Sequence, residues 1–196
     1  MPKLFYQGHG SFRLTADDGR VIYVDPYVGE GYDKPADLIL VSHDHGDHNQ
    51  VQLCAKKPNC RIISNKEALT EGRHNSFDID GIHIQAVESA NKNHKSDDCV
   101  GFIISINGVK LYASGDTSKT EQMNSFADMK LDYAIFCGDG FYNMDLDEAS
   151  DCAKLIGAKH NIIIHLKPGE LFDRGRAESW DAPNKIIIEP GQEINL

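Results

Sequence analysis

Short apolar runs separated by polar turns recur along most of the chain, and stretches with helical periodicity lie between them. Runs of about four to eight apolar or alternating residues, bounded by Gly, Pro, Asn or Asp, are typical of β-strands. Strands are therefore predicted at 3–7, 11–15, 20–24, 37–42, 60–64, 81–88, 100–106, 109–113, 131–137, 160–165 and 184–189. Strands in this number with helices between the later ones indicate an α/β protein with two packed sheets.

Helices are predicted at 50–57, 65–71, 119–127, 145–157 and 169–178. The segment 145–157 carries both end signals, because Asp145 can cap the first turn and Gly157 can close the last. Between these ends runs an apolar stripe formed by Leu146, Ala149, Ala153 and Ile156.

Three segments in the first half resemble three in the second half, at an offset of roughly 90–100 residues. The pairs are 21–25 with 110–116, 37–44 with 132–139, and 60–64 with 160–165. No Pro-, Gly- or Ser-rich linker interrupts the chain. We therefore expect one domain over 1–196, built from two β-rich halves of similar plan.

The composition and net charge of the chain limit the kinds of molecule that it is expected to bind. The chain has 196 residues, 40 % of them hydrophobic, and a formal net charge of -10. Acidic charge of this size disfavours a long nucleic-acid surface. A small anionic substrate stays compatible with it, because a bound metal ion can dominate the local field.

The sequence predicts a cytoplasmic protein that does not enter a membrane. Its first ten residues contain no long apolar run of the signal-peptide type, and no apolar run could span a bilayer. The cysteines are odd in number and form no CxxC pair, so reduced thiols are expected at all of them. They are Cys54, Cys60, Cys99, Cys137 and Cys152.

Residues 43–48 read His-Asp-His-Gly-Asp-His and directly follow the apolar run 37–42. Imidazole and carboxylate are ligands for Zn²⁺-like metals, so the segment predicts a metal site rather than a solvated, His-rich loop. Two further strand-like runs end in ligand-type residues, namely Asp116 and His165. Ligands at strand ends gain rigid positions.

This pattern resembles the metallo-β-lactamase superfamily. The box at 43–48 is similar to its signature, Gly115-Asp116-Thr117 to its bridging-aspartate motif, and His165 to its last ligand; His94 resembles the middle histidine. Within the superfamily the chain looks most like the UlaG-like, lactonase-like branch of metal-dependent hydrolases. The segments that carry this closer resemblance are Gly8-His9, Asp25-Pro26 and 144–149.

The resemblance implies a four-layer αββα sandwich, with two mixed sheets flanked by helices and a metal site at one edge. One ion would be held by His43, His45 and His94. Because the segment around His94 is polar and irregular, a neighbouring group could complete this site in its place.

The resemblance also implies a second ion, held by Asp47, His48 and His165, with Asp116 and a water bridging the two. Asp47 and Asp116, with the bridging water, would be the catalytic groups. Zn²⁺ is the expected metal, and Mn²⁺ or Fe²⁺ also suits nitrogen and oxygen ligands.

Four residues are candidates for the surroundings of the site. Asp25 could accept the second N–H of a ligand imidazole. His9 could reach the site or serve a structural role, Lys167 could bind an anionic group or be solvated, and Tyr142 could wall the pocket or belong to the core. The remaining histidines are predicted to be structural or solvated: His74, His83 and His160.

The predicted function is a dinuclear hydrolase that uses a metal-bridging hydroxide on a small ester, lactone, amide or phosphoester. A metal-dependent nuclease or phosphodiesterase of the same fold, and a non-catalytic metal-binding sensor, are the alternatives. The chain departs from the branch at 136–142, which includes Cys137, and at Leu166 after the last ligand. These departures touch the expected substrate wall and leave both the substrate and the oligomeric state open.

Overall fold

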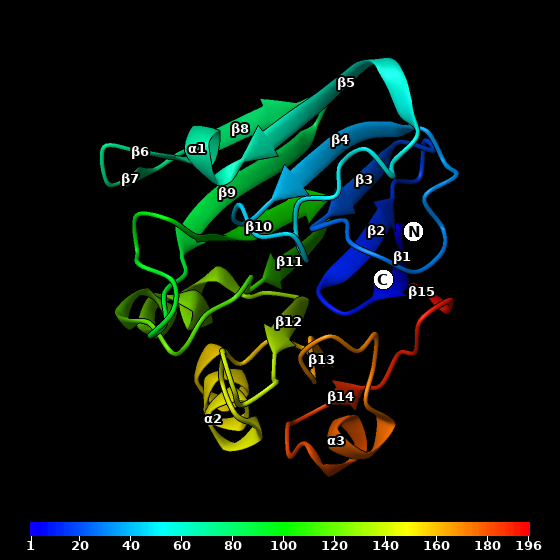
Figure 1. Ribbon diagram of the computed structural model, residues 1–196. Helices are drawn as coiled ribbons and strands as arrows, with labels where there is room; N and C mark the ends of the chain where they lie inside the picture. The colour runs from blue at the N-terminus through cyan, green and yellow to red at the C-terminus, as the bar shows by residue number, and fades with distance from the viewer.

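The computed structural model describes residues 1–196 and shows two mixed β-sheets packed face to face (Figure 1). The first sheet contains six strands. In spatial order they are β15 (Glu193–Asn195), β1 (Lys3–Gly8), β2 (Ser11–Thr15), β3 (Val21–Val24), β4 (Ala36–Val41) and β5 (Lys56–Ser64). Because β15 pairs with β1, the two ends of the chain lie close together.

The second sheet contains seven strands. Their spatial order is β14 (Lys185–Ile186), β13 (His160–Ile164), β12 (Tyr133–Cys137), β11 (Val109–Ala113), β10 (Val100–Ile106), β9 (Ile82–Glu88) and β8 (Ser76–Ile79). A separate two-residue pair, β6 (Leu69–Thr70) and β7 (Arg73–His74), forms a small hairpin.

The two sheets repeat one plan. In the first, β1, β2 and β3 run antiparallel, and β4 and β5 then continue parallel to β3. In the second, β9, β10 and β11 run antiparallel, and β12 and β13 continue parallel to β11. The internal resemblance in the sequence therefore corresponds to a structural repeat, in which β3, β4 and β5 match β11, β12 and β13.

Side chains alternate between the two faces along a strand, and both faces of the central strands are buried. One set of side chains fills the space between the sheets, with Phe12 and Leu40 from the first sheet meeting Phe102 and Ile135 from the second. The opposite face of the second sheet packs Phe136 and other apolar residues against the helices. Near-continuous apolar runs in β4 and β12 follow from this double burial.

Helices cover the outer face of the second sheet, where α2 (Leu146–Ile156), α3 (Arg174–Ser179) and the 3₁₀ helix η1 (Glu121–Met129) lie (Figure 1). The prediction at 145–157 is confirmed: the Asp145 carboxylate accepts a hydrogen bond from the backbone of Glu148, and Gly157 ends the helix with φ 65. None of the helices combines the length and hydropathy needed to span a bilayer.

The α/β sandwich is confirmed, but the helix predicted over 50–57 is wrong. That segment forms turns and then enters the long edge strand β5. Pro58 explains the difference, because proline disfavours helical backbone in the residue before it and is tolerated on an edge strand. The outer face of the first sheet is instead covered by irregular chain, which packs Tyr32 and Cys54 onto Tyr23.

The boundaries of several other predicted helices and strands also differ from those in the structure. The helix predicted at 65–71 is a single turn, α1 (Asn65–Ala68), before β6, and the helix predicted at 169–178 forms only at its end, as α3. The segment 119–127 adopts 3₁₀ geometry over Glu121–Met129, and the strand predicted at 184–189 shortens to β14. Strand β5 begins four residues earlier than predicted, at Lys56 rather than 60.

Candidate metal centre

The carboxyl ends of the parallel strands of both sheets meet at one edge of the sandwich. His43 follows β4, Asp116 follows β11 and His165 follows β13, and all three are buried. Three residues of the site that directly follow strands have left-handed backbone: His9 after β1, Asp25 after β3 and His165 after β13, with φ 54, 47 and 49. Non-glycine residues with such φ values cluster at functional sites, where the surrounding structure holds them in place.

The first predicted group of ligands is brought together. The ring nitrogens of His43, His45 and His94 lie within 4.8 Å of one another. Nε2 of His94 is 3.1 Å from Nδ1 of His45. His94 belongs to an irregular loop, as expected, yet its side chain is buried against the other two rings rather than exposed.

The second predicted group is also assembled, and it includes one further histidine. Asp47, His48 and His165 lie together with His9, their candidate ligand atoms within 4.8 Å of one another. Oδ2 of Asp47 is 3.8 Å from Nε2 of His165 and 3.9 Å from Nε2 of His48. The ring of His9 lies against the ring of His165, with a centroid distance of 3.8 Å.

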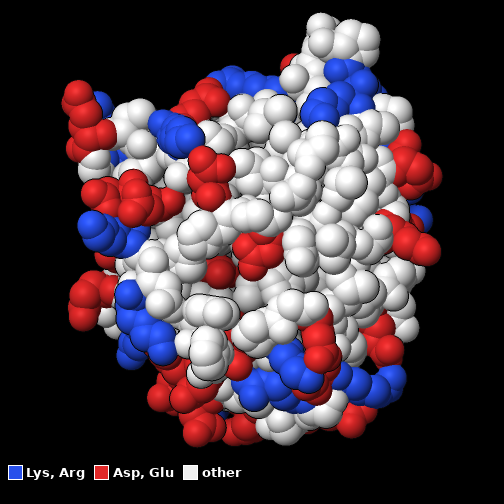
Figure 2. Space-filling model, in the orientation of Figure 1, with Lys and Arg blue, Asp and Glu red and all other residues white.

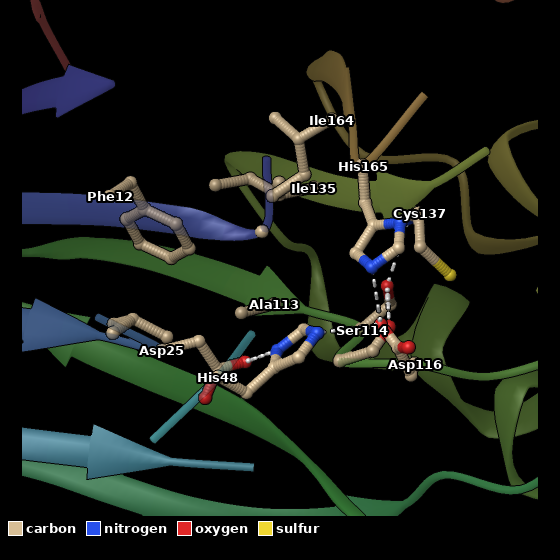
Figure 3. Close-up of a pocket in the computed structure, with 13 residues that line it drawn as sticks. Phe12, Asp25, His48, Ala113, Ser114, Asp116, Ile135, Cys137, Ile164 and His165 are labelled. Carbon is tan, nitrogen blue, oxygen red and sulfur yellow. Dashed lines mark hydrogen bonds and ion pairs between the residues drawn. The ribbon is translucent and has the colours of Figure 1, made fainter. Parts of the chain in front are cut away.

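Asp116 lies between the two groups. Its Oδ1 is 3.3 Å from Nε2 of His48 and 3.5 Å from Nε2 of His165, and it also forms a candidate metal group with His43 and His48. Figure 3 shows the rings of His48 and His165 directed toward this carboxylate. Apolar side chains on the core side, such as Phe12, keep these surroundings dry, which strengthens electrostatic interactions.

The residues fit a metal ion. Four buried atoms at the centre have no hydrogen-bond partner: Nε2 of His43, His48 and His165, and Oδ1 of Asp116. Each such atom would cost roughly 1–3 kcal/mol if it stayed unpaired. Spacings of 3.3–3.9 Å between them and their neighbours are those of ligands around shared ions at about 2.0–2.2 Å.

Asp25 fixes the orientation of two rings. Its Oδ2 lies 3.0 Å from Nδ1 of His48 and accepts a 2.7 Å hydrogen bond from the Ser42 hydroxyl (Figure 3 shows the first contact). The Ser42 oxygen in turn lies 3.0 Å from Nδ1 of His43. Because the hydroxyl hydrogen is given to Asp25, Nδ1 of His43 must donate, and Nε2 of both rings is left as a lone pair facing the centre.

Asp139 is a residue that the sequence analysis missed. Its Oδ2 lies 3.1 Å from Nδ1 of His165, and its Oδ1 accepts backbone hydrogen bonds from Phe141 and Tyr142 at 2.6 and 2.7 Å. A signal was present, because the internal resemblance pairs 132–139 with 37–44 and so puts Asp139 at the end of a strand equivalent to β4. The departure of 136–142 from the branch pattern hid it.

His9 connects the turn after β1 to the site. Its Nδ1 donates a 2.9 Å hydrogen bond to the carbonyl oxygen of Glu170, since a carbonyl can only accept. Nε2 of the same ring faces Oδ2 of Asp47, 3.3 Å away. A proton or a metal cation between these two atoms would satisfy both, in keeping with the place of His9 in the candidate metal group.

The other predicted surrounding residues lie in different environments. Tyr142 lines an open cavity of about 300 Å³ beside the cluster. Lys167 forms a surface ion pair of 2.5 Å with Glu170 and does not line that cavity. The full lining of the cavity is His45, Asp47, Asn93, His94, Asp116, Tyr142 and His165.

Charge interactions keep the carboxylates ionised. Burial raises the pKa of Asp116, but the imidazoles of His165 and His48 outweigh it and hold that pKa below its usual range. Burial lowers the pKa of His43 to about 2, with the nearby rings adding to the effect. For His165, burial lowers the pKa, but Asp116 and Asp139 outweigh it and raise it well above the usual value.

The remaining histidines and the cysteines lie outside the cluster. His83 pairs with Asp78 at 2.7 Å, and His160 stacks on Tyr133. Cys137 is buried, with Sγ 3.4 Å from the carbonyl of Thr117, and burial raises the pKa of its thiol. All five cysteines are free thiols.

The protein is a two-sheet α/β sandwich, and a buried His/Asp cluster lies at the edge where its repeated halves meet. This combination defines a class of metal-binding proteins. Comparison with known proteins identifies the family. A model of the beta-lactamase superfamily domain matches residues 3–165. The chain therefore belongs to the metallo-β-lactamase superfamily, as the sequence motifs predicted.

Relatives and solved structures agree with this membership. A UPF0173 metal-dependent hydrolase of Saccharolobus solfataricus is 28 % identical, with 100 % of each chain covered. A metallo hydrolase of Ignicoccus hospitalis has a TM-score of 0.76 at 20 % identity, covering 98 % of this chain and 97 % of that one. A diiron beta-hydroxylase of Streptomyces venezuelae has a TM-score of 0.71 at 10 % identity, covering 100 % of this chain and 54 % of that one. The two structures share the fold.

Proposed function

We propose that the protein is a metal-dependent hydrolase with two metal ions, and that it acts on a small polar ester, lactone, amide or phosphoester. The observation that carries this proposal is the arrangement around Asp116, whose buried, unpartnered oxygen lies between two groups of imidazole and carboxylate ligands. The naming of the Saccharolobus solfataricus relative as a metal-dependent hydrolase supports the reaction class.

The spatial grouping of the histidines and aspartates supports the ligand sets that we propose. The first ion would be held by His43, His45 and His94, and Asp116 would be shared between both ions. The second would be held by Asp47, His48 and His165, with His9 next to it. Two divalent ions, Zn²⁺ by default and Mn²⁺ or Fe²⁺ as alternatives, would polarise a carbonyl or phosphoryl oxygen and lower the pKa of a shared water to about 7.

The side chains of the protein would hold the metal ions in place and transfer the proton. Asp47 is the more exposed of the two central carboxylates, with 37 % of its side chain open, and it lines the cavity. It is therefore the group placed to accept a proton from the attacking water and to return it to a leaving group. Asp116 is buried and stays ionised, so its role is to hold the centre together.

The cavity favours a small polar substrate. Its seven lining residues include a single hydrophobic one, and Tyr142 is the aromatic among them. A substrate ring or chain could lie against Tyr142 while its polar group reaches the cluster. The UlaG-like branch, with its lactone-type substrates, remains our proposal for the chain's place within the superfamily.

Nucleic acid is a poor fit. On the face shown in Figure 2, Lys and Arg side chains alternate with Asp and Glu around the edges, and no continuous basic surface crosses it. The net charge of -10 argues the same way. A cytoplasmic location is also part of the proposal, supported by the five free thiols.

Metal analysis tests the first part of the proposal. Purified protein should contain about two ions per chain, and Asp116→Ala or His48→Ala should lose them. Zero metal in protein prepared without chelators would refute the proposal.

Substrate screening tests the second part. The loaded protein is assayed against lactones, phosphodiesters and RNA, with Asp47→Ala as the blank. Cleavage of a lactone or small phosphoester, absent in the blank, is expected. Cleavage of RNA alone would establish the nuclease alternative, and two bound ions with no cleavage of the panel would favour the metal sensor over the hydrolase.

A further inference from the structure

A continuous line of polar contacts connects the two proposed metal positions through residues that are not themselves proposed ligands, apart from the histidine at each end. Nδ1 of His165 lies 3.1 Å from Oδ2 of Asp139, and the same oxygen accepts a 2.7 Å hydrogen bond from Nδ2 of Asn143. Oδ1 of Asn143 accepts from Nδ2 of Asn91 at 2.7 Å. Oδ1 of Asn91 lies 3.0 Å from Nδ1 of His94. We call this line the Asn91–Asn143 relay.

The direction of each amide hydrogen bond in the relay is determined, and the His165–Asp139 link is an ion-pair contact. A carboxylate can only accept, so Asn143 must face Asp139 with its NH₂ group and Asn91 with its oxygen. Asn91 must then face Asn143 with its NH₂ group, which leaves its oxygen toward His94. The oxygens of Asn91 and Asp139 therefore each face Nδ1–H of a ring, and when the ring is neutral, Nε2 of His94 or of His165 is left as a lone pair.

That tautomer is the one a metal ligand bound through Nε2 needs. Asp25 and Ser42 fix the same tautomer in His48 and His43. Each proposed ion therefore has one imidazole oriented by Asp25 and one oriented by Asp139. Asp139 contacts His165 directly, but it is linked to His94 only through the side-chain amides of Asn143 and Asn91.

Burial gives the relay its strength. Asp139, Asn143 and His94 are only 6 %, 8 % and 5 % exposed, and Asn91 is half-buried. Hydrogen bonds in such surroundings are stronger than in water, and a broken one leaves an unpaired group that is costly to keep buried. A break anywhere in the relay therefore disturbs its other members as well.

The relay also holds the substrate wall. Asp139 accepts from the backbone of Phe141 and Tyr142, and Asn93, two residues after Asn91, donates a 3.0 Å hydrogen bond to the carbonyl of Tyr142. Loop 89–98 and loop 139–145 are thus joined to each other and to both ligand groups.

We propose that Asn91 and Asn143 are positioning residues that couple the two metal positions: Asn91 fixes the tautomer of His94, and Asn143 holds the Asp139 carboxylate that orients His165. The proposal rests on the dinuclear function given above. Its distinctive consequence concerns Asn91, whose side chain contacts His94 of the first group but no residue of the second. Breaking the relay at Asn91 should weaken the ion held by His165 as well.

Zinc titration of metal-free protein against a chromophoric chelator tests this coupling. His45→Ala and Asp47→Ala identify which binding step belongs to which group. Asn91→Ala and the near-isosteric Asn91→Asp, whose second oxygen would face an acceptor, should each weaken both steps by about 10- to 100-fold. Asn59→Asp, at an exposed position of the edge strand β5 away from the relay and the cavity, is the matched control and should leave both steps within about twofold.

Two further measurements separate a relay from local damage. In a double-mutant cycle, Asn91→Ala combined with Asn143→Ala should cost little more than either change alone, because one break already interrupts the line. Long-range ¹H–¹⁵N spectra should show Nδ1–H tautomers for His94 and His165 in the loaded wild type, and mixed tautomers for His94 in metal-free Asn91→Ala.

The outcomes distinguish the two proposals. If wild-type protein binds no zinc, the dinuclear function fails. If it binds two ions and Asn91→Ala or Asn91→Asp weakens only the step that His45→Ala removes, the dinuclear function stands and the relay is refuted. Additive losses in the double-mutant cycle would refute the relay as well. Circular dichroism of each variant establishes that folded protein is compared throughout.

Discussion

The carboxylate of Asp25 and the imidazole of His48 form a buried contact of 3.0 Å between Oδ2 and Nδ1. The other carboxylate oxygen accepts the backbone N–H of Ser42 at 2.7 Å. Asp25 reaches both partners because its backbone is left-handed, with φ 47, a conformation that Asp and Asn adopt more readily than other non-glycine residues. One residue thus ties the end of β3 to the His-rich segment that follows β4.

Asp25→Asn should weaken metal binding by about 10- to 100-fold while leaving the protein folded. Asparagine tolerates the left-handed backbone but removes the negative charge and can present an NH₂ group to Nδ1 of His48. The affinity for Zn²⁺, measured by competition with a chelator, reports the effect. Asp181→Asn, at a side chain that is 89 % exposed, is the control. Equal affinities in the two variants would show that Asp25 does not orient His48.

The candidate metal ligands could be predicted from the sequence because the patterns that mark them are local. The box at 43–48 is contiguous, and Asp116 and His165 each follow an apolar strand directly. The strand pattern and the repeat between the halves then bring these strand ends to one edge. Both features depend on short-range periodicity, which a sequence displays.

Asp139 and the cover of the first sheet could not be predicted in the same way. The internal repeat put Asp139 at a strand end, but its role depends on a ring that lies 26 positions later in the chain and on amides in its own loop, and no local pattern encodes these contacts. Over 50–57, Pro58 and the pairing of β5 with β4 outweighed a helical-looking composition. His9 was recognised only as a candidate, because its place depends on how the turn after β1 docks on Glu170.

Gly10→Ala should impair the metal centre through steric contact alone. A Cβ added at Gly10 would lie 2.8 Å from Cε1 of His48 and 3.5 Å from Cδ2 of His165, and the backbone there does not need positive φ. The His48 ring is held from behind by Asp25, so it cannot move away without losing that contact. Zinc affinity should fall by about tenfold.

The control for that substitution is Gly175→Ala. This glycine lies in α3, and its added Cβ would make only an ordinary contact, 3.5 Å from a carboxylate oxygen of Asp173. Alanine is favoured over glycine in a helix by about 1 kcal/mol, so thermal stability should rise or stay unchanged, with zinc affinity unaffected. Wild-type zinc affinity in Gly10→Ala would show that the ring has room to shift.

Tyr142→Ala should raise KM for a substrate found in the screen by several-fold while kcat changes by less than about threefold. Tyr142 lines the cavity beside the cluster, but its own carboxyl-terminal neighbours and Asp139 hold the loop, so the ligand rings should keep their places. Phe141→Ala is a matched control, because Phe141 is the more exposed of the pair and does not line that cavity. A fall in kcat with KM unchanged would place Tyr142 in the chemical step instead.

Asp132 provides a prediction about pH and stability at the far end of the second sheet. Its carboxylate accepts hydrogen bonds from the backbone of Lys110 at 2.9 Å and from Nζ of Lys159 at 2.7 Å. Partial burial raises the pKa of Asp132, but these two donors outweigh it and hold the pKa below its usual value. A carboxyl group with a lowered folded-state pKa stabilises the protein above its unfolded pKa, about 3.9, and this contribution is lost as the pH falls through the folded value.

Asp132→Asn should therefore lower the free energy of unfolding at pH 7 by about 1 kcal/mol, and the difference from wild type should shrink as the pH falls below about 4. Urea denaturation of both proteins at a series of pH values measures the difference directly. Asp181→Asn, which removes an exposed partner of Lys154, should show no comparable gap at any pH. A gap of constant size across the series would mean that Asp132 stabilises the strand ends through packing or neutral hydrogen bonds, not through its ionised form.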